Sequence, residues 1–189
     1  MDDGSLATVL LAMFAGAIRV STPFLFVCLG ECLTEKSGRI NLGLEGTLVF
    51  GAMSGYALSF HTGSPWIGVL GAGVVGVLFG AIHGYLCKLP KVNDIAIGIA
   101  LMLFGTGAAF FFGKAYIQPQ AARLPSISFG GWSDDSAVQQ ALEINPLFII
   151  GFFLAVAMWW AFKNTRWGLI VRTTGDSTTA AVALGINVD

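Results

Sequence analysis

Five long apolar segments constrain what this chain can fold into more than any other feature. They run from Leu6 to Leu33, Asn41 to Phe60, Trp66 to Leu89, Ile95 to Gly113 and Pro146 to Phe162. A helix needs ~20 mostly apolar residues to cross a hydrocarbon core ~30 Å thick. Only 11% of the 189 residues are charged, whereas soluble domains carry about 25%. The sequence therefore predicts an all-α, polytopic membrane protein with about five transmembrane helices near 6–33, 41–60, 66–89, 95–113 and 146–162.

The basic residues between these segments predict the orientation of the chain, because Lys and Arg collect on the cytoplasmic side of a membrane. Those that follow the first, third and fifth segments are Lys36, Arg39, Lys88, Lys91, Lys163, Arg166 and Arg172. The opposite side holds an acidic N-terminus and an outer loop, 114–145, whose basic residues are Lys114 and Arg123. We expect the N-terminus outside and the C-terminus inside, with a transmembrane domain over 1–163 and a cytoplasmic segment over 164–189.

The N-terminus and the long loop before the fifth segment are the two notable features of the predicted outer side. The N-terminal residues, MDDG, are acidic, whereas a secretory signal begins with a positive region, so the first segment is predicted to be a retained span. The outer loop 114–145 is longer than a simple connection needs, and loops of that length are either functional or linkers. It is interpreted as a small cap or docking surface, with a solvated linker as the alternative.

Small residues recur every fourth position along the third segment, and this spacing places them on one helix face. They are Gly68, Ala72, Gly76, Gly80 and Gly84. Because lipid provides no hydrophobic driving force between helices, small residues that allow close backbone approach are typical of helix contacts in membranes. The stripe is therefore predicted to be a packing face.

The cytoplasmic segment carries the pattern of a short surface helix. Asp176 is suited to the N-cap position of a helix from Ser177 to Leu184, and Gly185 follows where a left-handed residue commonly ends a helix. This helix is rich in small residues and only weakly apolar, so we expect it to lie at the membrane surface, where a soluble partner can contact it.

Composition and motifs exclude several function classes. The net charge is -1 and the 10 basic residues are scattered, which argues against binding to nucleic acid. The cysteines, Cys28, Cys32 and Cys87, lack CxxC spacing, and no cluster of metal ligands is recognisable. Neither a phosphate-binding GxxxxGK[ST] motif nor a catalytic triad is present. We predict no enzymatic activity, no metal and no cofactor in this chain.

Polar residues inside or beside the apolar segments are candidates for a substrate pathway. Arg19 lies within the first segment, where Pro23 allows a kink, and it either faces the bundle or extends its side chain to the interface. Asn41 and Glu45 open the second segment, either as a favourable helix start or as pathway residues. Asn93 opens the fourth, with helix capping as the alternative to substrate contact.

Three stretches together resemble a known family: SGRINLGLEG from Ser37, KVNDIAIGIAL from Lys91, and NTRWGLIVRTTGDSTTAAVALGINVD from Asn164. They resemble the permease subunits of bacterial ABC importers of the branched-chain amino acid and simple sugar class, nearest to the nucleoside and simple sugar branch. The resemblance implies a multi-pass subunit of the inner membrane that carries nucleosides or related sugar-like solutes by alternating access. It also implies three partners: a second permease subunit, an external solute-binding protein, and a cytoplasmic ATPase that binds the ATP.

The same resemblance assigns a role to the cytoplasmic segment, where the family carries its ATPase-coupling helix. The residues that match are Thr165, Arg166, Gly168, Arg172, Gly175, Asp176 and Gly185. Family members continue with further spans, so this chain is expected to be truncated or completed by another polypeptide. Two alternatives stay open: a fragment of a secondary transporter or channel driven by an ion gradient, and a truncated remnant that does not transport.

Overall fold

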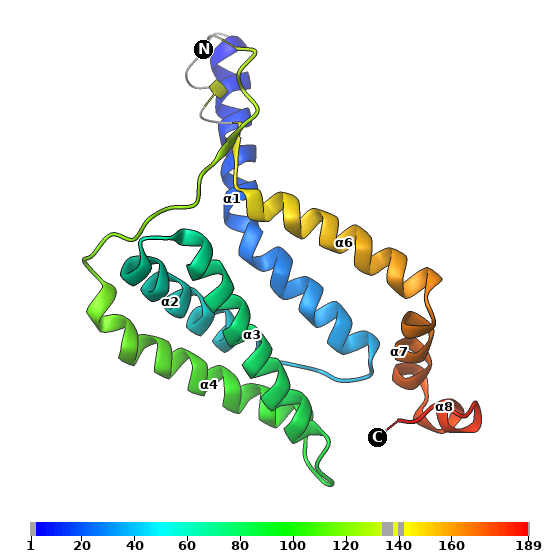
Figure 1. Cartoon of the computed structure of the whole chain (residues 1–189). Coiled ribbons are helices and arrows are strands. Elements are labelled where there is room, and N and C mark those ends of the chain that lie inside the picture. The colour runs from blue at the N-terminus through cyan, green and yellow to red at the C-terminus, as the bar shows by residue number, and fades with distance from the viewer. Residues whose placement is uncertain (1–2, 134–137, 140–141, 189) are drawn as a thin grey trace. The chain divides into compact units, whose positions relative to one another are not determined.

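A computed structural model describes residues 3–133, 138–139 and 142–188 of the chain. The fold consists mainly of helices, as predicted (Figure 1). The long helices are α1 (Asp3–Lys36), α2 (Leu44–Thr62), α3 (Pro65–Cys87), α4 (Asp94–Gly113) and α6 (Pro146–Asn164). The shorter elements are the 3₁₀ helix η1 (Lys114–Tyr116), the strands β1 (Ile127–Ser128) and β2 (Glu143–Ile144), and the helices α7 (Arg166–Asp176) and α8 (Thr178–Ala183).

Four helical segments among the described residues are long and apolar enough to cross a membrane: Thr8–Lys36, Pro65–Cys87, Asp94–Tyr116 and Pro146–Asn164. The predicted second span forms α2, which is not among them, so the fifth span stays a prediction. At 19 residues and 1.5 Å per residue, α2 is about 28 Å long. It packs between α3 and α4, and a helix with protein on two sides needs fewer apolar side chains than one surrounded by lipid.

The chain divides into two compact units, and the first comprises Met1–Leu29 and Leu124–Trp160. In this unit α6 packs against α1, since a Cβ added to Gly151 would lie 2.7 Å from Cδ2 of Leu25. β1 and β2 pair antiparallel, with Ile127 opposite Ile144. Helix α1 continues without a break through Pro23, so a kink at this proline stays a prediction.

The second unit comprises Gly30–Arg123 and Ala161–Asp189, and glycines hold its helices together. A Cβ on Gly55 of α2 would lie 2.9 Å from the carbonyl oxygen of Gly68 in α3. On the other side of α2, a Cβ on Gly46 would lie 2.6 Å from Cα of Met102, and one on Gly105 of α4 would lie 2.6 Å from the carbonyl oxygen of Gly46. These distances are too short for a real Cβ, so the α2–α3 and α2–α4 contacts both depend on bare backbone.

The small-residue stripe of α3 is a tight packing face over only part of its predicted length. Gly68 and Ala72 meet α2, but a Cβ on Gly76, Gly80 or Gly84 would have no neighbour within 4 Å among the described residues. The reason lies in Phe79, whose ring is 5.6 Å from that of Phe50 in α2 and 6.2 Å from that of Phe104 in α4. Beyond Ala72, large aromatic side chains fill the interface instead of glycines.

The first part of the outer loop, residues 114–123, is tied to the end of α2 by polar contacts. The hydroxyl of Tyr56 donates to the carbonyl oxygen of Pro119 and accepts from the N–H of Ala121 at 3.2 Å. Ser59 Oγ donates to the carbonyl oxygen of Ala122 at 3.0 Å. This part of the loop is therefore an ordered strap and not a freely solvated linker. Tyr56 and Ser59, near the end of α2, form these hydrogen bonds with the backbone of the strap.

Candidate functional site

The turn between α1 and α2, residues 37–43, is the structural centre of the candidate site. Gly38 adopts a left-handed conformation, with φ of 82°, which ends α1 at little steric cost because glycine has no Cβ. The N–H of Gly38 donates to the carbonyl oxygen of Glu35 at 2.9 Å, and that of Arg39 donates to Thr34 at 3.2 Å. These bonds use the last carbonyls of α1, as in other glycine-ended helices.

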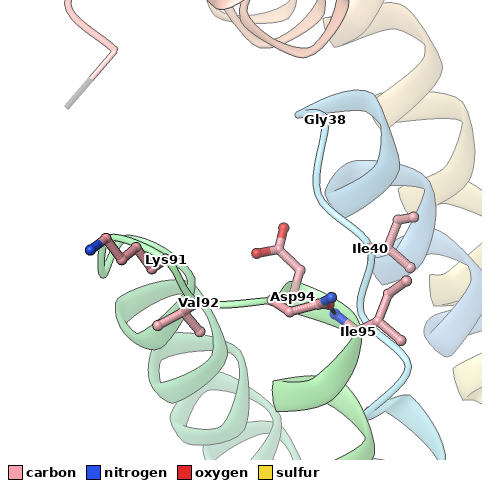
Figure 2. A pocket seen from close by; sticks show the side chains of 7 residues that line it. Gly38, Ile40, Lys91, Val92, Asp94 and Ile95 are labelled. Carbon is pink, nitrogen blue, oxygen red and sulfur yellow. Dashed lines mark hydrogen bonds between the residues drawn. The ribbon is translucent and has the colours of Figure 1, made fainter.

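An ion pair joins this turn to the start of α4. Nη1 of Arg39 donates to both carboxylate oxygens of Asp94 at 3.1 Å. The side chain of Arg39 is 48% exposed and that of Asp94 is 18% exposed, so water screens the pair only partly. Figure 2 shows the Asp94 carboxylate between the Gly38 turn and the Lys91 loop, beside an open hollow of about 530 Å³.

Two predicted pathway residues act as local caps. The Oδ1 of Asn41 accepts from the N–H of Gly43 at 2.9 Å, which delays the start of α2 to Leu44. The Oδ1 of Asn93 accepts from the N–H groups of Ile95 and Ala96 and caps α4. The capping alternative for Asn93 is therefore confirmed, and the side-chain oxygens of both asparagines are already engaged.

The other two predicted pathway residues have different surroundings. Glu45 lies in the first turn of α2 and is exposed, a position favourable for a carboxylate at the positive end of a helix. Arg19 belongs to the first unit, where its Nε donates to the carbonyl oxygen of Glu143 at 3.2 Å. This bond links α1 to the start of β2 and uses part of the guanidinium. A pathway role for Asn41, Glu45, Asn93 and Arg19 stays a prediction.

Sequence reasoning missed Glu31, near the C-terminal end of α1. Its Oε1 accepts from the backbone N–H of Asn41 at 3.2 Å. Its Oε2 is buried and has no hydrogen-bond partner among the described residues. A carboxylate inside a predicted span is itself a signal of function, and this signal could have identified Glu31 from the sequence.

The segment 164–188 folds as two capped helices where the sequence predicted one. Thr165 caps α7, and its Oγ1 accepts from the N–H of Gly168 at 3.1 Å. Ser177 is extended, with φ of -161° and ψ of 111°, and its side chain accepts from the N–H of Ala180 to cap α8. The prediction of Asp176 as the cap was wrong, because Asp176 is the last residue of α7.

The end of α8 agrees with the sequence. Gly185 has φ of 76°, and its N–H donates to the carbonyl oxygen of Val182 at 2.9 Å. The N–H of Ile186 donates to Ala181 at 3.0 Å, and the two bonds together form a Schellman motif. Gly185 therefore ends the helix as predicted, at a position where any other residue would be strained.

Two glycines seat α7 against the rest of the second unit. A Cβ on Gly168 would lie 2.5 Å from Cα of Phe162, at the end of α6. A Cβ on Gly175 would collide with the carbonyl oxygen of Lys36 and would lie 2.9 Å from the nitrogen of Gly38. Of the remaining predicted residues, Arg172 donates from Nε to the carbonyl oxygen of Gly168 at 3.3 Å, and Arg166 is exposed.

The described residues contain no group of three or more His, Cys, Asp or Glu side chains placed to hold a metal ion. His83 and Cys87 are buried together on α3, with 3.6 Å between Nε2 and Sγ. They line a second hollow of about 250 Å³, whose wall also includes Val171 of α7. The candidate site therefore consists of the structured turn and the helix pair α7–α8.

Comparison with known proteins gives a consistent family match. The family model described as branched-chain amino acid transport system / permease component matches residues 13–189. The ABC transporter permease protein TsgC13 of Haloferax volcanii is 30% identical over 183 residues, which cover 90% of this chain and 54% of that protein. No solved structure matches the chain.

Two further relatives carry substrate names. The nucleoside ABC transporter permease protein NupC of Lactococcus lactis is 27% identical over 187 residues, which cover 92% of this chain and 59% of that protein. The glucose ABC transporter permease protein TsgB13 of Haloferax volcanii is 25% identical over 191 residues, covering 88% and 48%. The chain thus spans about half the length of the curated relatives it matches.

Proposed function

Because the chain belongs to the branched-chain amino acid transport system / permease component family, we propose that it is the membrane-spanning permease of an ATP-driven importer. Members of this family are non-enzymatic membrane proteins, and the apolar helices α1, α3, α4 and α6 suit that environment. The chain has no phosphate-binding loop of its own. A separate cytoplasmic ATPase therefore supplies the energy, a second permease subunit completes the pathway, and an external solute-binding protein delivers the solute.

The α7–α8 pair is the observation that carries this proposal. A short helix that is capped at both ends, by Ser177 and Gly185, holds a defined shape without a large core. On and beside this helix the apolar side chains of Val182 and Leu184 are 62% and 70% exposed. Exposed apolar side chains on an ordered element are typical of a protein-binding surface. We assign this surface to contact with the ATPase, on the cytoplasmic side.

The solute is proposed to be a nucleoside or a related sugar. NupC is named for nucleosides and TsgB13 for glucose, and both kinds of solute present several hydroxyl groups. Carboxylate and amide side chains pair well with hydroxyls. In the second unit the exposed Glu45 is the pathway candidate whose side chain is not used as a cap, so we expect it to contribute most to solute binding.

The test is uptake of radiolabelled guanosine and glucose by cells that express the chain together with an ATPase, a second permease subunit and a solute-binding protein. We expect ATP depletion to abolish uptake and a protonophore to leave most of it intact, because ATP hydrolysis and not an ion gradient drives transport. Cells without the chain provide the control. Uptake that survives ATP depletion but collapses with the protonophore would overturn the proposal in favour of a secondary transporter.

A further inference from the structure

The contact between Gly38 and Gly175 joins two parts of the chain that lie far apart in sequence. A Cβ on Gly38 would be 3.0 Å from both Cα and the carbonyl oxygen of Gly175. A Cβ on Gly175 would meet the backbone of Lys36 and Gly38 in turn. Both partners are backbone, which cannot rotate away as a flexible side chain can. The end of α7 is therefore seated directly on the turn between α1 and α2.

Helix α7 is held at its two ends and is less supported between them. Its first turn is fixed at Gly168 against the end of α6, and its last turn is fixed at Gly175. Val171, between these anchors, faces the hollow of about 250 Å³ that His83 also lines. Helix α7 is unbroken from Arg166 to Asp176, so its hydrogen-bonded backbone connects the two contacts directly.

The turn between α1 and α2 contacts α4 and α1, and it leads directly into α2 at Leu44. Arg39 pairs with Asp94 at 3.1 Å, and a Cβ on Gly98 of α4 would lie 2.6 Å from the nitrogen of Leu42. The N–H of Asn41 donates to Glu31 of α1 at 3.2 Å. These contacts connect the turn to α4, and the backbone connects it to α2, so a displacement of the turn would reach the starts of both helices.

We propose that Gly38 and Gly175 are positioning residues that transmit movement of the α7–α8 pair to the turn and, through the Arg39–Asp94 pair, to the inner ends of α2 and α4. This inference rests on the proposed function, since it describes how an ATPase bound at α8 opens or closes the pathway. Energetic coupling between sites travels through elements with discrete arrangements. Here the transmitting element is helix α7, whose last turn contacts the turn between α1 and α2.

The test compares Gly175→Ala and Gly38→Ala with Gly73→Ala in the complete transporter, reconstituted in lipid vesicles. Gly73 is also a glycine of this unit, but a Cβ there would meet nothing within 4 Å. We expect both contact variants to assemble and to hydrolyse ATP, but to lower solute uptake per ATP by about tenfold, within the usual range of coupling effects. Gly73→Ala should behave as the unchanged protein does.

A second set of variants covers the case in which the alanine variants fail to assemble. Arg39→Asp and Asp94→Arg should each uncouple hydrolysis from uptake, and the double variant should restore coupling because the ion pair is rebuilt in reverse. Normal uptake per ATP in Gly175→Ala, or in both single charge variants, would overturn the inference. If the unchanged transporter itself shows no ATP-driven uptake, the proposed function fails instead, so the two failures are distinguishable.

Discussion

Replacement of Gly46 by alanine tests whether bare backbone holds α2 against α4. The added Cβ would lie 2.6 Å from Cα of Met102 and 2.7 Å from the carbonyl oxygens of Leu101 and Met102. Overpacking of this kind costs ~1–3 kcal/mol. The upper end applies here, because all three neighbouring atoms belong to the backbone and cannot move independently of α4. The helices must separate to admit the methyl group.

The matched control is Gly76→Ala in α3, where a Cβ would meet no atom of the described part of the chain within 4 Å. In an open helix interior, alanine is favoured over glycine by ~1 kcal/mol. For a chain of 150–250 residues, 1 kcal/mol shifts Tm by roughly 2–4 °C. The same gain applies to Gly46 in α2, so the net cost of Gly46→Ala is ~2 kcal/mol. We therefore expect Gly46→Ala to lower Tm by roughly 4–8 °C, whereas Gly76→Ala should raise it by roughly 2–4 °C.

The measurement is thermal unfolding of the purified protein in lipid nanodiscs, followed by tryptophan fluorescence. Both variants add the same methyl group to a glycine of the same unit, so they differ only in what the methyl group meets. If Gly46→Ala melts at or above the temperature of Gly76→Ala, the close α2–α4 contact is refuted. An equal fall in both variants would contradict the open surroundings of Gly76.

Three other changes have defined outcomes. Glu31→Ala should lower Tm in the same assay by more than Glu31→Gln does. Alanine leaves the N–H of Asn41 without its acceptor, at a cost of ~1–3 kcal/mol. Equal Tm values for the two variants would show that this hydrogen bond does not contribute to stability. Ser177→Ala should speed hydrogen exchange in α8, because it removes a cap that contributes ~1 kcal/mol, whereas Asp176→Ala should leave the exchange unchanged. Faster exchange in the Asp176 variant alone would show that Asp176 is the cap. Glu45→Gln should raise the KM for solute uptake about tenfold through loss of a charge-assisted hydrogen bond; an unchanged KM would leave Glu45 as a helix-start residue only.

The membrane-spanning character and the family could be predicted from the sequence because both depend on local patterns. A span requires an apolar run of a certain length, and no distant residue can cancel that requirement. Gly185 could be placed for a similar reason, since a glycine after a short helical pattern commonly ends the helix. The capping role of Asn93 was open beforehand because capping and solute binding use the same side-chain atoms.

The errors in the predicted helix boundaries arise where neighbouring residues are equally suited to the same local role. Asp176 and Ser177 are both good N-cap residues, and the sequence offered no way to rank them. The structure assigns the cap to Ser177, because α7 continues through Asp176. Helix α7 itself was missed because Gly168 and Gly175 reduce helix propensity, and their contacts with α6 and the α1–α2 turn supply the stability that propensity does not.

The sequence by itself determined that this chain is a helical membrane protein of the permease family, where its apolar helices lie, and that Gly185 ends a helix. Only the tertiary structure decided which glycines are contact points. A Cβ on Gly46, Gly98, Gly105 or Gly175 would meet backbone, whereas one on Gly76, Gly80 or Gly84 would meet none of the described residues within 4 Å. All of these glycines are alike in a linear pattern. Their difference arises because a missing Cβ matters only where a second segment of backbone occupies the space, and which segment arrives there depends on the packing of the whole unit.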